Sequence, residues 1–514
     1  MMPRMKKICL LISVLLVCLV SCAKPANGKD GSSWDDLFGQ EGENNAGYVT
    51  EGRSTLDLPY VISDHMVLQQ DCEAKIWGTA TPDAKVTVQA SWSEEKVSAR
   101  VGKDGKWVVA VKTPKASFTP WTLTIKDSQG GGTKIEDVLV GEVWFSAGQS
   151  NMQHPMRGFG SVANGNWQPV ENYQQELESA SIPSFRYFRG KYQLSDSPKD
   201  DTKEGEWWIS DPTSALEFQA VAYFFGRKLS QDLGVPIGII GCAYGGSRIE
   251  AWMSRKSLED NFTANEWKDT SDLGKKEGDT DKQIPAQIYN GMVLPLVNYG
   301  VRGWLWYQGE SNRDNHFAYD RLLSVMVDEW RTLWGDTKAE KPFYFVQLAA
   351  FTSIDPLGAP RVRDAQLRAI DLIPNCGIVN ACDCGSTATV HYPGKKPVGE
   401  RLALWAESKD YGISKINPMA PVAESASFSG GKATVKLSNA GGLHLGNGRD
   451  KVLNAEVAGS DGVFQPAEVS IEGESLVFSS SKVSDPKKVR YCYSSWCEGT
   501  LYNGDGLPVF PFSL

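Results

Sequence analysis

The middle of the chain, residues 141–408, alternates apolar strand-like runs with amphipathic helical stretches, and this pattern constrains the fold more than any other feature. Such alternation is typical of a parallel sheet covered by helices. We therefore predict an α/β fold for this segment. The expected strands are Val138–Phe145, Ile237–Gly241, Gly303–Tyr307 and Phe343–Gln347, and the expected helices are Ala220–Leu233 and Tyr319–Leu333.

Residues 51–140 and 409–514, on either side of this segment, have a different pattern. Short β-branched and aromatic runs are separated there by Pro, Gly, Asn and Asp turns, which favours all-β modules of sandwich type. The expected strands include 75–77, 85–88, 107–111 and 121–125 in the first module and 433–437, 467–471, 475–478 and 489–493 in the second.

The N-terminus has the features of an export signal. Arg4, Lys6 and Lys7 precede the apolar run Ile8–Val20, which is too short to span a bilayer. We expect residues 1–21 to be a signal peptide and residues 22–50, which are rich in Gly, Asn, Ser and acids, to be a flexible tether. Residues 19–22 (LVSC) are similar to a bacterial lipobox, which makes Cys22 a candidate lipid anchor of a cell-envelope protein; the alternative is an ordinary secretory signal.

The charge of the chain excludes some classes of partner. Without the signal, three of the 53 basic residues are lost and the net charge is −12. Nucleic acid is therefore not expected as a partner, and we expect contact with a membrane only through Cys22. Seven cysteines remain, and Cys492 with Cys497, or Cys376 with Cys382 or Cys384, are close enough in sequence to form disulfides. Their spacing does not fit a zinc site, so no metal is expected.

Polar turns follow the first three strands of the middle segment, where ligands bind in sheets of this kind. The first turn, Gly148–Met152 (GQSNM), places Ser150 near a helix start, where a hydroxyl and backbone N–H groups are exposed. Taken alone, Ser150 is better explained as a helix cap. Met152 replaces the last glycine of the G-x-S-x-G motif, which disfavours an α/β-hydrolase.

Two further turns and one histidine follow in order. The second turn contains Gly245, Gly246 and Ser247, the third is Trp306–Asn312 (WYQGESN), and His391 lies near the end of the segment. This set resembles the SGNH-type esterases, and most closely the sialate O-acetylesterase family, in which G-Q-S-N, G-G-T and W-Y-Q-G-E-S-N recur in this order. The resemblance extends over nearly the whole chain, with Ser247 where the family often has Thr.

The resemblance implies a role for each of these residues. Ser150 would be the nucleophile and His391 the general base. The oxyanion of the tetrahedral intermediate would be bound by the N–H groups of Ser150 and Gly246 and by one side-chain amide, with Gln308 preferred to Asn312.

The acid of the triad is missing from its usual place. Members of the family commonly have an Asp two or three residues before the histidine, where this chain has Thr389 and Ala388. The remaining candidates are Asp383 and Glu310, unless a backbone carbonyl orients the ring. This absence motivates the alternative interpretation, a noncatalytic carbohydrate-binding surface lipoprotein on an esterase scaffold.

The expected function is that of a serine esterase that removes O-acetyl groups from carbohydrates, with O-acetylated sialic acid or acetylated xylan as substrate and no cofactor. The candidate substrate-binding residues lie near the three turns. Arg157 and Arg248 could bind a substrate carboxylate or hydroxyls, and Trp252 could stack on a sugar ring. The other two candidates are Gln149 and Asn151.

Overall fold

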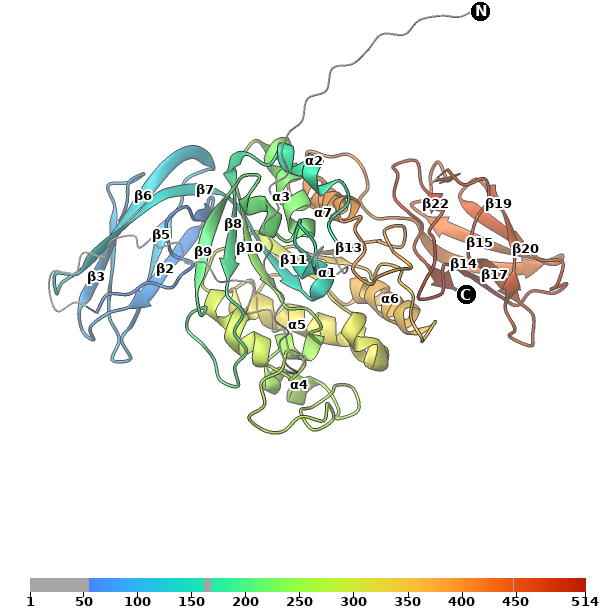
Figure 1. Ribbon diagram of the computed structural model, residues 1–514, viewed down its shortest axis with the longest axis horizontal. Coiled ribbons are helices and arrows are strands. Elements are labelled where there is room, and N and C mark those ends of the chain that lie inside the picture. The colour runs from blue at the N-terminus through green and yellow to red at the C-terminus, as the bar shows by residue number, and fades with distance from the viewer. Residues whose placement is uncertain (1–54, 161–167, 447) are drawn as a thin grey trace, which may run out of the picture. The chain divides into compact units, whose positions relative to one another are not determined.

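The computed structural model describes residues 55–160, 168–446 and 448–514. Its central sheet has the strand order β13-β12-β11-β7-β10-β8-β9 (Figure 1). All neighbouring strands in this order are parallel except β8 and β9, so the predicted α/β fold with a parallel sheet is confirmed. The strands are β7 (Gly132–Gly148), β8 (Ile182–Gly190), β9 (Gly205–Ser210), β10 (Ile237–Ala243), β11 (Gly303–Tyr307), β12 (Phe343–Val346) and β13 (Cys376–Val379).

Helices cover both faces of this sheet. Successive side chains of a strand point to opposite faces. In β7, Trp144 packs against Phe225 of α3, whereas its neighbour Phe145 packs against Trp330 of α5. Helix α7 packs beside α3, and α5 and α6 lie on the other side of the strands (Figure 1). The α-helices are α1 (Ser150–Gln153), α2 (Tyr173–Glu178), α3 (Ala220–Leu233), α4 (Arg255–Asn261), α5 (Tyr319–Leu333), α6 (Gly358–Arg368) and α7 (Lys396–Lys409).

Strand β7 links the N-terminal β module to the central sheet. Its first half pairs with β6, its middle pairs with β1, and its last residues pair with β10 and β11. The boundary predicted after residue 140 therefore falls inside one continuous strand. The strands of this module are β1 (Val67–Gln69), β2 (Glu73–Thr79), β3 (Lys85–Ala90), β4 (Lys96–Arg100), β5 (Lys106–Lys112) and β6 (Ser117–Asp127).

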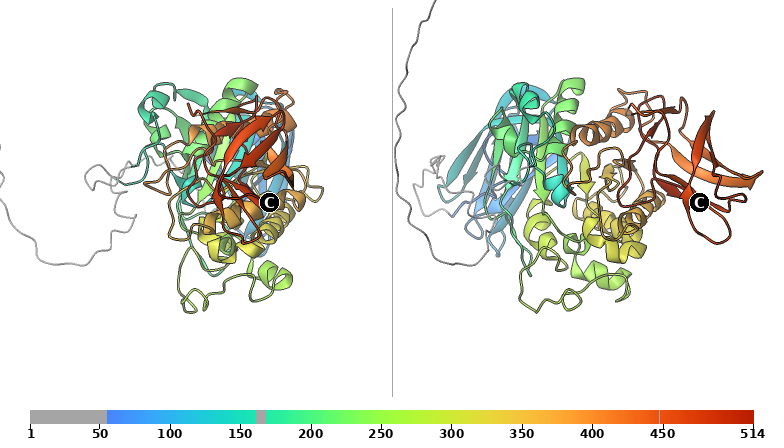
Figure 2. Two further views of the ribbon diagram at one scale, coloured as in Figure 1. Left: turned by 90° about the vertical axis from the view of Figure 1, so that its right-hand side faces the viewer. Right: turned by 45° about the vertical axis from the view of Figure 1, so that its right-hand side comes forward.

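The C-terminal β module contains two four-stranded antiparallel sheets, β14-β15-β20-β19 and β18-β17-β21-β23, and the short pair β16-β22 (Figure 2). It has a hydrophobic core of its own that includes Val435, Phe478 and Tyr491. The strands are β14 (Val422–Ser429), β15 (Lys432–Ser438), β16 (His444–Leu445), β17 (Ala455–Ala458), β18 (Gln465–Pro466), β19 (Glu468–Glu472), β20 (Ser475–Ser479), β21 (Lys488–Tyr491), β22 (Leu501–Tyr502) and β23 (Phe512–Ser513).

The signal, the tether and Cys22 lie outside the described residues. Within the described ranges, no helix is long and apolar enough to cross a membrane. All seven cysteines there, from Cys72 to Cys497, are free thiols, so the disulfides considered from sequence spacing do not form in this structure.

Candidate active site

Ser150 stands at the end of β7, on a turn that only glycine can make. Gly148 has a φ of 140°, and a Cβ built on it would lie 2.2 Å from the carbonyl oxygen of Tyr307. The next residue, Gln149, donates its backbone N–H to that same carbonyl at 2.9 Å. Ser150 then begins helix α1, beside the end of β11.

The three polar turns meet at this point, as expected for the carboxyl ends of neighbouring parallel strands. The Gln149 Oε1 accepts the backbone N–H groups of Gly309 and Ser311 in the third turn, at 3.1 and 3.3 Å. In the second turn, Gly245 donates its N–H to Gln153 Oε1 at 2.7 Å, and a Cβ built on Gly245 would lie 3.3 Å from the Cβ of Ser150.

Backbone donors are available beside Ser150. The N–H groups of Ser150 and Gly246 donate to no acceptor among the described residues. Gly246 has a φ of 73°, a left-handed conformation that glycine adopts without strain. The Gln149 Nε2 also donates to no described acceptor, and Gln149 lines the cavity at Ser150, so this amide is a candidate donor to a ligand.

Gln308 and Asn312 do not have the arrangement that the resemblance implied. Both side chains are fully buried. Gln308 Nε2 donates to the Ser247 carbonyl at 3.0 Å and to Asn312 Oδ1 at 2.7 Å. Asn312 Nδ2 donates to Glu250 and Asn315 at 2.8 and 3.1 Å. Since both hydrogens of each amide already have acceptors, these residues brace the turns and present no free donor to an oxyanion.

His391 lies on a loop that is tethered next to Ser150. Asn151, which follows Ser150, donates from Nδ2 to the carbonyl of Val390, which precedes His391, at 3.2 Å. This hydrogen bond holds the two predicted catalytic residues on neighbouring segments. The imidazole contacts the ring of Phe159 at a centroid distance of 4.9 Å, and no hydrogen bond joins it to Ser150 or to any other described residue. Burial and the charge of Lys395 lower the pKa of His391 to about 4, so the ring is a neutral base at pH 7.

A buried polar cluster of Asn151, Glu310 and Lys395 supports this loop. Lys395 Nζ donates to Asn151 Oδ1 at 2.6 Å, and Asn151 Nδ2 donates to Glu310 Oε1 at 2.5 Å. Burial lowers the pKa of Lys395 to about 7 and raises that of Glu310. Asn151 is therefore a structural link between two buried ionisable groups. Sequence reasoning missed Lys395, although it lies only four residues after His391.

No acid candidate contacts the imidazole. Asp383 forms an ion pair with Arg401, with Oδ2 2.6 Å from Nη2, and although burial alone would raise its pKa, Arg401 lowers it. Glu310 Oε1 is bound by Asn151. Thr389 Oγ1 accepts the backbone N–H of His391 at 3.0 Å, so Thr389 shapes the loop and does not hold the ring.

Three of the predicted substrate-binding residues have structural roles instead. Trp252 is fully buried, donates from Nε1 to Ser247 Oγ at 3.0 Å and cannot stack on a sugar. Arg157 forms a two-point ion pair with Glu217. Arg248 is buried and pairs with Asp314 and Glu250, which joins the second and third turns.

A cavity of about 450 Å³ opens at Ser150. Its lining includes hydroxyl groups, one aromatic ring and a single arginine. Arg313 and the segment 351–353 were missed from the sequence because they belong to no motif quoted above. The lining residues are Gln149, Ser150, Glu310, Ser311, Arg313, Phe351, Thr352, Ser353, Thr387, Ala388, Thr389 and Val390.

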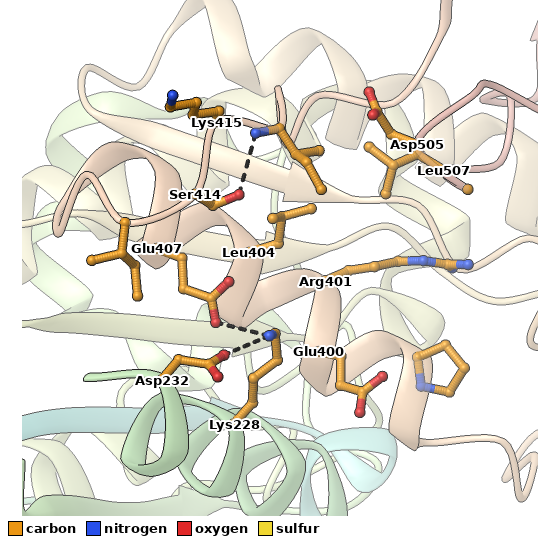
Figure 3. Close-up of a pocket in the computed structure, with 14 residues that line it drawn as sticks. Lys228, Asp232, Glu400, Arg401, Leu404, Glu407, Ser414, Lys415, Asp505 and Leu507 are labelled. Carbon is orange, nitrogen blue, oxygen red and sulfur yellow. Dashed lines mark hydrogen bonds and ion pairs between the residues drawn. The ribbon is translucent and has the colours of Figure 1, made fainter. Parts of the chain in front are cut away.

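A larger cavity, of about 820 Å³, lies elsewhere and contains none of the motif residues. Figure 3 shows Lys228 of α3 bound to Asp232 and Glu407, at 2.6 and 3.1 Å. Arg401 also lines it but is paired with Asp383. Because Lys228 and Arg401 already form ion pairs and no residue of the three turns lines this cavity, its larger volume does not make it the candidate reactive site. Within the described ranges, no group of His, Cys, Asp or Glu is arranged to hold a metal ion.

The chain is similar to known carbohydrate esterases. A family model described as carbohydrate esterase, sialic acid-specific acetylesterase matches residues 140–406, which include all three turns and His391. The sialate O-acetylesterases of Mus musculus and Homo sapiens are each 28% identical, covering 70% and 73% of this chain and 74% and 75% of theirs. A crystal structure of a carbohydrate acetylesterase from Xanthomonas citri is 32% identical with a TM-score of 0.78, covering 90% of this chain and 99% of that one.

Proposed function

Because this chain belongs to the sialic acid-specific acetylesterase family of carbohydrate esterases, we propose that it removes O-acetyl groups from sugars with Ser150 as its nucleophile. The observation that carries the proposal is the turn at Ser150. Ser150 lines a cavity, a Cβ built on Gly245 would lie 3.3 Å from the Cβ of Ser150, and the N–H groups of Ser150 and Gly246 donate to no acceptor among the described residues. A nucleophile next to preorganised donors is what acyl transfer requires.

In the first half of the reaction, Ser150 Oγ attacks the acetyl carbonyl carbon while His391 accepts the hydroxyl proton. The negative charge on the carbonyl oxygen is stabilised by the N–H groups of Ser150 and Gly246, with Gln149 Nε2 as the side-chain donor in place of Gln308 or Asn312. The bond from the carbonyl carbon to the sugar oxygen then breaks, and His391 returns its proton to that oxygen.

In the second half, water replaces the sugar. His391 takes a proton from the water, which attacks the acetyl group on Ser150. The bond to Ser150 Oγ then breaks to release acetate, and His391 gives its proton to Ser150 Oγ. Neutral imidazole is needed in both halves, and the lowered pKa of His391 keeps it neutral at pH 7. The hydrogen bond from Ser150 to His391 forms with substrate, since catalytic hydrogen bonds are often long without it.

We take Ser150 and His391 to work as a dyad, because Asp383 and Glu310 are held by other partners. As substrate we propose O-acetylated sialic acid, which the names of the mammalian relatives support, or acetylated xylan as a neutral alternative. We further propose export as a cell-envelope lipoprotein anchored at Cys22, supported by the lipobox-like residues 19–22.

The proposal is tested by acetate release from 4-nitrophenyl acetate, O-acetylated sialic acid and acetylated xylan by the protein without its signal. Ser150→Ala is expected to lower kcat/KM at least about 10³-fold on every substrate, because it removes the nucleophile. Folding of the variant is checked by its melting temperature. Equal rates for the folded variant and the parent protein would contradict the proposal, and so would a folded parent that releases no acetate.

A further inference from the structure

Among the described residues, Arg313 is the one arginine that lines the cavity at Ser150, and it lies on the 3₁₀ helix η6 (Glu310–Ala318), which begins in the third turn. We infer that Arg313 binds the carboxylate of the substrate, so that this esterase prefers acetylated acidic sugars to neutral ones. The inference rests on the proposed function of Ser150 and adds a residue that decides between its two candidate substrate classes.

The guanidinium is held in place but not fully used. Its Nε donates to the Glu310 carbonyl at 3.0 Å, and its Nη1 donates to Ser353 Oγ at 2.9 Å. The ring of Phe351 lies 5.6 Å from the guanidinium carbon. Nη2 donates to no acceptor among the described residues. The orientation of the group is thus fixed, and one edge stays available for a ligand.

The charge of Arg313 has no carboxylate partner within ion-pair distance in the part of the chain described. Asp314 pairs with Arg248. A Cβ built on Gly358 would lie 2.9 Å from Asp355 Oδ2 and 3.3 Å from Arg313 Cδ, so Asp355 is a neighbour of Arg313, but the two form no ion pair. The two arginines that the sequence suggested for substrate binding are different, because Arg157 and Arg248 each form an ion pair with a carboxylate.

One carboxylate, that of Glu310, also lines the cavity, and its effect on a bound anion must be considered. Glu310 Oε1 is bound by Asn151, which in turn accepts from Lys395, so a buried ammonium group faces this carboxyl group. Burial raises the pKa of this carboxyl group, and the charge of Arg313 also acts on it and, like that of Lys395, lowers its pKa. Arg313 is therefore the cationic group of the lining, and its Nη2 has no acceptor among the described residues and stays available to an anion.

The rest of the lining suits a sugar. The hydroxyl groups of Ser311, Thr352, Ser353, Thr387 and Thr389 can hydrogen-bond to sugar hydroxyls without adding charge. Arginine binds a carboxylate through parallel charge-assisted hydrogen bonds, which are stronger than neutral ones. Sialic acids and uronic acids both carry such a carboxylate, and the structure assigns this shared chemistry to Arg313.

The experiment compares each acetylated acidic sugar with its own methyl ester, which removes the charge and leaves the acetyl group in place. One arm uses an O-acetylated sialic acid glycoside and the other an O-acetylated glucuronoside. We expect wild-type kcat/KM to favour the free acid about 10- to 100-fold in at least one arm, mainly through KM, as charge-assisted hydrogen bonds are worth about 1.5–3 kcal/mol. The arm that shows the preference identifies the acid.

Arg313→Gln should abolish this preference, measured as the ratio of kcat/KM for the free acid to that for the methyl ester, since only the free acid carries the carboxylate. Arg313→Lys keeps the positive charge but loses the planar guanidinium that binds a carboxylate through two hydrogen bonds, and it should retain part of the preference. The matched control is Arg449→Gln in the C-terminal module, where the exposed Arg449 pairs with Glu498 and should leave the preference intact.

The outcomes separate the inference from the proposed function. If the folded wild type does not hydrolyse 4-nitrophenyl acetate, the proposed function fails. If it does so but treats acid and methyl ester alike in both arms, or if Arg313→Gln keeps the preference, the assignment to Arg313 is overturned and the proposed function stands.

Discussion

The two halves of the proposed catalytic machinery are supported in different ways. Around Ser150, the turns are joined to one another directly, since Gln149 Oε1 binds two N–H groups of the third turn and Asn312 Oδ1 accepts the N–H of Ile249 at 3.0 Å. Around His391, the ring itself has no hydrogen bond among the described residues. Its loop is joined to the residue after Ser150 by the hydrogen bond from Asn151 to the Val390 carbonyl, and within the loop Thr389 accepts the N–H of His391.

The difference shows which half the sheet preorganises. The nucleophile and its backbone donors follow from strands β7, β10 and β11, which lie side by side and end at the same edge. The base depends on buried polar side chains outside the sheet. We therefore expect substitutions in the cluster of Asn151, Glu310 and Lys395 to affect the base more than the nucleophile.

The largest effect is expected from removing the base. His391→Ala should lower kcat/KM for acetate release about 10³-fold or more, because it removes the group proposed to take the proton of Ser150. Steady-state acetate release at pH 7 measures it. The matched control is Asp383→Asn, which weakens the buried pair with Arg401 and should lower melting temperature with little change in kcat. An equal loss of kcat in the two variants would mean that Asp383 orients His391.

A smaller effect is expected from removing the hydrogen bonds that join Asn151 to Val390 and Lys395. Asn151→Ala should lower kcat about 10²-fold, since a misplaced catalytic group costs about that much, and should destabilise the fold by about 3 kcal/mol through unpaired buried groups. Kinetics and denaturant unfolding measure the two effects. Asn380→Ala is the control, because Asn380 is equally buried and binds Pro508 and Cys382 instead. If both variants lose activity alike, the hydrogen bonds of Asn151 have no specific role in catalysis.

Much of this architecture could be predicted from the local sequence pattern, but contacts between segments distant in the sequence could not. The predicted helices over residues 220–233 and 319–333 have those bounds in the structure, because apolar spacing reports a buried face. Strand β8 was missed, since Arg186 and Arg189 interrupt its apolar run. The use of Gln308 and Asn312 as braces could not be predicted, because it depends on Glu250, Asn315 and Ser247, which only the fold brings together.

The smallest effect concerns the missing acid. The lowered pKa of His391, about 4, predicts that kcat/KM stays level down to about pH 4 and falls below it, as the base becomes protonated. Thr389→Asp places a carboxylate near the ring and should raise that pKa, which moves the acid limb up by about 1 to 3 pH units and raises kcat at pH 8. A pH profile of both proteins measures this. An unchanged limb would show that residue 389 does not face the imidazole.

The central claim is that Ser150 is acylated, and the most direct measurement is its covalent labelling by a fluorophosphonate followed by peptide mass spectrometry. We expect one adduct, on the peptide that contains Ser150, no adduct in Ser150→Ala, and much slower labelling in His391→Ala. An adduct on another serine, or steady acetate release by a wild-type protein that remains unlabelled, would contradict the account.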